Sequence, residues 1–111
     1  MNRQNKYTKD EIILCTFIAM FGRGYIDEKH IFDLEKCRSI ASIKMKVSNI
    51  AAMLLDNKYE ISEEISPLSG TPSGRPARKT NWDIVAKLAP LDESNFLKTH
   101  FKIFERIFTH L

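Results

Sequence analysis

The chain has few residues of the kinds that build metal, disulfide and nucleotide sites. It contains two cysteines and three histidines in 111 residues, with no C-x-x-C or H-x-x-x-H pair of the sort that zinc sites use. The two cysteines, Cys15 and Cys37, predict buried thiols of a cytoplasmic protein and not a disulfide framework. No Gly-rich loop ending in Gly-Lys-Ser/Thr is present to hold a nucleotide phosphate. We therefore expect no metal and no cofactor.

Residue pairs suited to catalysis are also scarce. The adjacent carboxylates Glu63-Glu64 and Asp92-Glu93 occur in polar segments that we interpret as solvated joints. Cys15 stands among apolar residues, and a thiol in such surroundings is poorly reactive. We therefore predict that the protein is not an enzyme.

Long hydrophobic runs are absent as well. The longest apolar stretch, residues 12–21, is interrupted by Thr16 and is too short to cross a bilayer. The first ten residues are polar and lack the apolar segment of a secretory signal. These absences predict a cytoplasmic protein with no membrane partner.

The composition that remains is that of a single globular domain. Hydrophobic residues make up 43% and charged residues 28%, which argues against wholesale disorder. The length fits one domain over residues 1–111. The net charge of +3 allows a nucleic-acid partner without requiring one.

Capping signals mark three helices in the first half of the chain. Thr8 and Glu11 form a capping box, and Gly22 is suited to end the helix behind it. The expected starts and ends of the three helices are, in order, Thr8 and Gly22, Asp27 and about Lys36, and Ser39 and about Leu55. Their short joins predict a helix-turn-helix core over residues 7–55.

The second half of the chain begins with irregular sequence. A short strand is possible at residues 59–62, where apolar and polar residues alternate weakly. Residues 66–80 form a loop with three of the four prolines and two of the four glycines, and its charges are all positive: Arg75, Arg78 and Lys79. A loop this long in a small domain is usually functional or disordered, so we count these three residues as possible DNA contacts.

Two further helices are expected in residues 81–111. One begins at Thr80 or Asn81 and ends at Pro90, and the last begins at Asp92 or Ser94 and reaches the C-terminus. The predicted fold class is therefore all-α, with at most one short β element, and consists of a helix-turn-helix core followed by C-terminal helices.

The third helix has the pattern of a recognition helix. One apolar stripe follows i, i+4, i+7 and i+11 spacing, in Ile43, Val47, Ile50 and Leu54. We place the polar side chains on the opposite face, where Lys suits phosphate and Ser or Asn suits phosphates or base edges. A solvated helix face of the same composition is the alternative reading.

The start of this helix resembles a known family. The R-S/T-x-x-S-I-x-M-K-L/V-x-N pattern belongs to the N-terminal domain of a group of bacterial HNH endonucleases, and residues 38–50 resemble it. The first helix of that group opens with W/Y-T-x-E-E-L, to which residues 7–14 are similar, and the Gly/Arg-containing loop that follows is similar to residues 70–79. The resemblance covers residues 7–85.

The catalytic half of that group has no counterpart in this sequence, because no His-Asn-His cluster is present. The resemblance therefore implies a DNA-binding module without the nuclease. It implies that the candidate contacts with double-stranded DNA on the helix are Arg38, Ser39, Ser42, Lys44, Lys46 and Asn49. A transcriptional regulator and the DNA-reading module of a nuclease-related system both fit this interpretation.

The last predicted helix carries a wide apolar face. Its main stripe consists of Leu97, Phe101, Phe104 and Phe108. This surface either completes the core of a monomer or forms the interface of a homodimer. It also supports an alternative function, a small interaction module of phage or mobile-element type that binds a host protein.

Overall fold

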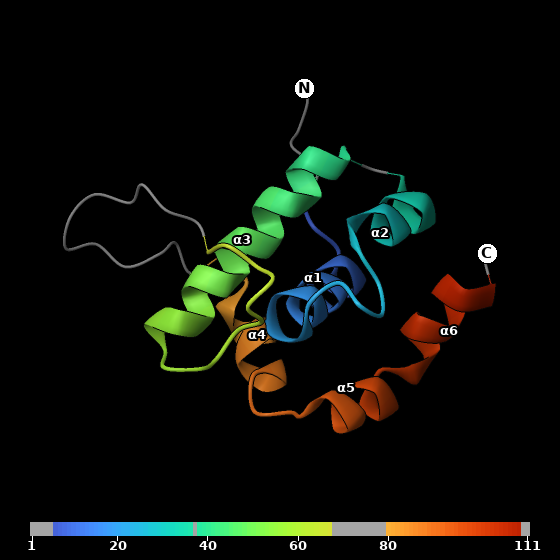
Figure 1. Ribbon diagram of the computed structural model, residues 1–111. Helices are drawn as coiled ribbons and strands as arrows, with labels where there is room; N and C mark the ends of the chain where they lie inside the picture. The colour runs from blue at the N-terminus through green and yellow to red at the C-terminus, as the bar shows by residue number, and fades with distance from the viewer. Residues whose placement is uncertain (1–5, 37, 68–79, 110–111) are drawn as a thin grey trace.

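The computed structural model describes residues 6–36, 38–67 and 80–109, and all regular structure within these ranges is helical (Figure 1). The helices are α1 Lys9–Phe21, α2 Glu28–Glu35, α3 Ile40–Asp56, α4 Trp82–Leu88, α5 Glu93–Thr99 and α6 Phe101–Thr109. The all-α prediction is confirmed. The strand considered at residues 59–62 is not formed, and this irregular segment instead lies against α1, where the Ser62 N–H donates to the Ala19 carbonyl at 3.0 Å. Four residues named above lie outside the described ranges: Cys37, Arg75, Arg78 and Lys79.

Helix α1 is the centre of the molecule, and the other helices surround it (Figure 1). Its sequence is apolar on every side, and each residue from Glu11 to Ala19 is buried. Both predicted ends are confirmed: Thr8 and Glu11 form the capping box, and Gly22 ends the helix with φ 87°. The positive φ favours glycine at this position, and a Cβ there would lie 2.7 Å from the Ser62 Oγ, so that the Ser62 side chain would have to move.

The caps predicted for α2 and α3 are also present. The Asp27 carboxylate accepts from the N–H groups of Lys29 and His30, and Lys36 ends α2 in the left-handed region at φ 53°. The Ser39 Oγ accepts from the Ser42 N–H at 3.1 Å at the start of α3. All four residues of the predicted apolar stripe of α3 are buried against the core. The description of this pair as a helix-turn-helix stays a prediction.

The prediction of one continuous last helix is wrong. The chain leaves helical geometry at His100, with φ −115° and ψ 31°, so that α5 and α6 run in different directions. The reason lies in the core, because the rings of Phe96 and Phe104 both pack on Phe17, at 5.2 and 4.9 Å. Eight residues of straight helix would separate the two backbone positions by about 12 Å. The break lets the two rings approach to 6.3 Å.

None of the described helices combines the length and apolar character needed to cross a membrane.

Candidate nucleic-acid interface

The motif residues that begin α1 and α3 meet in a buried polar cluster. Glu11 has no exposed surface, and the Arg38 side chain, 10% exposed, grips its carboxylate with two nitrogens: Nε to Oε2 at 3.0 Å and Nη2 to Oε1 at 3.1 Å. The Arg38 Nη2 also donates to the Lys6 carbonyl at 3.1 Å. Pairing through two hydrogen bonds fixes both the position and the orientation of the Arg38 guanidinium on the Glu11 carboxylate. Arg38 therefore joins α3 to α1 and is not presented to a nucleic acid.

Tyr7 extends this cluster along α3. The Arg38 guanidinium lies 3.8 Å from the centre of the Tyr7 ring, within the range of a cation–π contact. The Tyr7 hydroxyl donates to the Ser42 carbonyl at 3.0 Å and lies 2.9 Å from the Ser42 Oγ. Ser42 is thus held from the inner side of the helix, and Ser39 is occupied as the cap.

Lys46 also points inward. It is only 8% exposed, and its Nζ donates to the Asn81 Oδ1 at 2.8 Å, immediately before α4. Desolvation by burial lowers the pKa of this ammonium, and the nearby Arg38 charge lowers it further while Cys15 opposes the shift. The spacing of Lys46 in the sequence indicates this burial. Lys46 stands three residues after Ile43 and four before Ile50, so it lies on the same side of the helix as the buried stripe.

The outer face of α3 consists of other residues. Lys44 is exposed, Met45 is 64% exposed, and Ala41 is exposed beside them, while Ser48 and Asn49 are half-buried. Lys44 and Asn49 are the two predicted contact residues whose side chains lie on this face without an internal role. The sequence pattern also placed Met45 and Ser48 beside Lys44 on this face, and only Ala41 was missed, because it carries neither a charge nor an amide.

The helix itself carries no negative charge over most of its length. No Asp or Glu occurs from residue 36 to residue 55, and the first carboxylate, Asp56, is the last residue of α3. Lys36 and Lys6 are exposed near the start of the helix. The first three turns of α3 therefore offer a surface of small and polar side chains around the exposed Met45, with lysines nearby.

The apolar stripe predicted on the last helix is divided by the break at His100. Leu97 lies on α5 and is half-buried, whereas Phe104 on α6 is buried in the core. Phe101 and Phe108 are 59% and 39% exposed, and the Tyr25 ring lies 5.3 Å from that of Phe108. The exposed aromatic side chains here are Tyr25, Phe108 and Phe101, which precedes Phe108 by seven residues on the same face of α6, and we call these three the aromatic patch.

No metal or nucleophilic centre accompanies these surfaces within the described ranges. No group of three or more His, Cys, Asp or Glu side chains there is arranged to hold a metal ion. Cys15 is fully buried, and desolvation, with Glu11 acting in the same direction, raises the pKa of its thiol. A thiol held in its neutral form is a weak nucleophile.

Comparison with known proteins adds no relative: no family model matches the chain, and neither do any curated proteins or solved structures.

Proposed function

We propose that the protein binds double-stranded DNA through the exposed face of the first three turns of α3. The observation that carries the proposal is this face itself, which has small and polar side chains, one exposed methionine, an exposed lysine and no carboxylate before Asp56. The resemblance of residues 38–50 to the N-terminal domain of HNH endonucleases supports the same function.

The chemistry of the face suits a groove of duplex DNA. Ala41 and Ser48 are short, and the exposed Met45 between them is an apolar side chain that can contact a thymine methyl group in the groove. Lys44 has no ion-pair partner among the described residues and is free to bind a phosphate. Asn49 can donate to and accept from a base edge.

The buried cluster gives this face a fixed orientation. The Glu11–Arg38 pair and the Tyr7–Ser42 hydrogen bond attach the first turn of α3 to the start of α1. A reading helix loses less conformational entropy on binding when its position is already set. In this proposal Arg38 and Ser42 position the helix, and Lys44 and Asn49 from the same stretch contact the DNA.

The test is a titration of a fluorescent mixed-sequence DNA duplex at two salt concentrations. The variant Lys44→Ala is expected to bind more weakly and to reduce the slope of log K against log salt by about one, because one phosphate contact is lost. The matched control is Lys98→Ala, which removes an exposed lysine from α5. Equal affinity and slope for both variants would contradict the proposal.

A second candidate function is favoured by the aromatic patch of Tyr25, Phe101 and Phe108. Exposed aromatic side chains are enriched at protein interfaces. We propose a second copy of the chain as the partner, since two-fold pairing is the commonest assembly of soluble proteins. Light scattering of the wild type and of Phe101→Ser/Phe108→Ser tests it: a dimer that the variant converts to a monomer supports this function, and a monomeric wild type at high micromolar concentration excludes it.

A further inference from the structure

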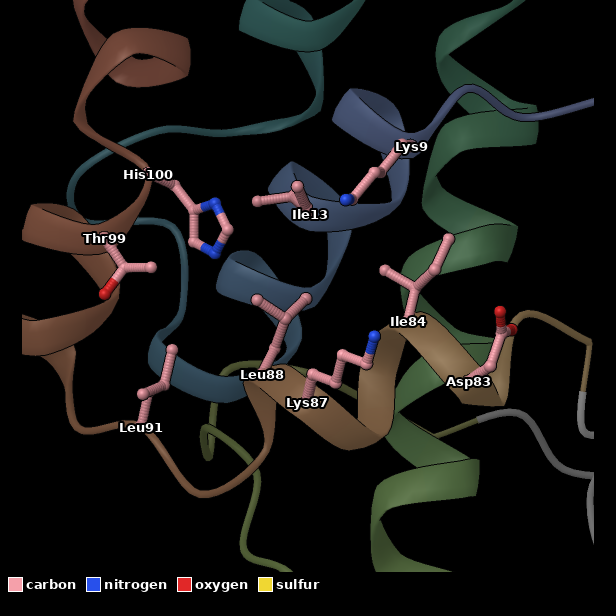
Figure 2. Close-up of a pocket in the computed structure, with 9 residues that line it drawn as sticks. All are labelled: Lys9, Ile13, Asp83, Ile84, Lys87, Leu88, Leu91, Thr99 and His100. Carbon is pink, nitrogen blue, oxygen red and sulfur yellow. The ribbon is translucent and has the colours of Figure 1, made fainter.

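A cavity of about 550 Å³ lies on the side of α1 that faces α4 and the break between α5 and α6. Figure 2 shows its lining: Lys9 and Ile13 from α1, Asp83, Ile84, Lys87 and Leu88 from α4, with Leu91, Thr99 and His100. Its volume is within the range of small-molecule sites, which runs from about 300 to 1,000 Å³. Neither the outer face of α3 nor the aromatic patch shares a residue with this lining.

One part of the lining is apolar. Ile13 and Leu88 belong to the hydrophobic core, and Ile84 and Leu91 are half-buried beside them. These four side chains come from α1, α4 and the segment after α4, so they bound the space from more than one direction. An aliphatic chain or an aromatic ring is the group that such a wall would shield from water.

The other part of the lining is cationic. Lys9 and Lys87 extend into the space between α1 and α4 from its two sides (Figure 2). Neither ammonium has an ion pair or hydrogen bond with another described residue, although Asp83 is also in the lining. Two unpaired cations beside an apolar wall attract an anion more strongly than they would in open solvent.

His100 forms the opposite side of the cavity, and its position follows from the break between α5 and α6. Partial burial and the neighbouring Lys9 charge lower the pKa of His100, while Asp10 acts in the opposite sense. The imidazole is therefore neutral at pH 7 and can donate one ring N–H to an oxygen of a bound molecule.

We propose that this cavity binds a small amphipathic anion, in which a carboxylate or phosphate monoester lies between Lys9 and Lys87 and an aliphatic or aromatic body lies on Ile13, Ile84 and Leu88. The proposal does not depend on DNA binding, because the cavity and the outer face of α3 consist of different residues.

Isothermal titration calorimetry with sodium decanoate and with decyl phosphate, both below their micellar concentrations, tests the affinity. Decyltrimethylammonium, which has the same chain and the opposite charge, is expected not to bind. The variant Lys9→Gln/Lys87→Gln is expected to weaken decanoate binding roughly five- to tenfold, since each exposed charge contributes modestly. Lys98→Gln/Lys102→Gln removes the same charge outside the cavity and is expected to bind as the wild type does.

The NMR signals of the two described histidines identify the location. Decanoate is expected to shift the ring signals of His100. The signals of His30, which is hydrogen-bonded to Asp27 and lies outside the cavity lining, are expected to stay unchanged. Co-sedimentation with phosphatidylglycerol vesicles that the lysine double variant loses would assign the anion to a lipid, and its absence would assign it to a free molecule. No binding at millimolar decanoate, equal affinity in the two double variants, or a shift of His30 alone would overturn the proposal.

Discussion

Within residues 38–50, some side chains pack inside the protein and others are exposed to solvent. Arg38 and Lys46 are the cations that a reader of the sequence would first assign to phosphate, and both are engaged inside the protein. Each spans two helices or segments that are distant along the chain, with partners 27 and 35 residues away. Their charges thus stabilise the arrangement of α1, α3 and α4.

The Glu11–Arg38 pair is expected to be essential for stability. Arg38→Met leaves the Glu11 carboxylate buried without its partner, and breaking such a pair costs about 3 kcal/mol or more. Urea denaturation measures the loss. The double variant Glu11→Leu/Arg38→Met is expected to recover part of it, because no unpaired charge is then buried; equal stability of Arg38→Met and wild type would contradict this role.

Lys46 is expected to be dispensable for DNA binding. Lys46→Met keeps an unbranched side chain in the same space and loses one hydrogen bond to Asn81, at a cost of no more than about 2 kcal/mol. In the anisotropy titration its affinity and salt slope are expected to equal those of the wild type. The paired variant Lys44→Met is expected to lose affinity, and the opposite ranking would mean that Lys46 leaves the interior on binding.

His100 is expected to make stability depend on pH. Its pKa is lowered in the folded protein, first by burial and then by Lys9, so the unfolded chain binds the proton more tightly. Its contribution is therefore present above about pH 6.5, the ordinary value for histidine, and is lost as the pH falls through the lowered pKa. An NMR titration is expected to show a raised His100 pKa in Lys9→Gln and a lower one in Asp10→Asn. No change in either variant would contradict the assigned causes.

At the scale of elements, local chemistry predicted the starts of α1, α2 and α3. Thr8, Asp27 and Ser39 each accept backbone hydrogen bonds at the predicted cap, and these bonds involve residues only two or three positions away. Local signals of this kind are fully present in the sequence. The stripe of α3 could be predicted for the same reason, because its period is a property of the helix itself.

The break at His100 and the inner cluster could not be predicted in this way. No proline or glycine marks residues 93–109, and the cause of the break is the packing of Phe96 and Phe104 on Phe17, a residue of another helix. The partner of Arg38 likewise stands 27 positions earlier. The candidate DNA site was predicted only in part, since charge alone does not distinguish a lysine that faces the core from one that faces solvent.

The two faces of α6 are expected to respond differently to the same substitution. Phe104→Asp places an unpaired carboxylate in the core and is expected to unfold the protein, at a cost of several kcal/mol. Phe101→Asp changes an exposed position and is expected to stay folded. Circular dichroism with thermal melting distinguishes them, and a folded Phe104→Asp variant would show that α6 is not a required part of the core.

At the scale of the whole molecule, α1 separates the surfaces to which we assign functions. In Figure 1, α3 lies on one side of α1, and α5 and α6 lie on another. Arg106 attaches α6 to α1 through an ion pair with Asp10 at 2.9 Å and to α2 through an ion pair with Glu35 at 3.7 Å. Because α3 and α6 lie on different sides of α1, DNA bound to α3 would leave the aromatic patch of Tyr25, Phe101 and Phe108 accessible to a partner.

The burial of α1 from Glu11 to Ala19 also has a consequence for how such a protein can diversify. A helix whose middle residues all touch neighbours has no position at which a mutation meets only water. Nearly every change there alters packing, and changes in packing are usually destabilising. The exposed positions of α3, among them Ala41, Lys44 and Met45, carry no such constraint. Descendants of this chain could acquire a new binding preference on α3 while α1 stayed almost unchanged.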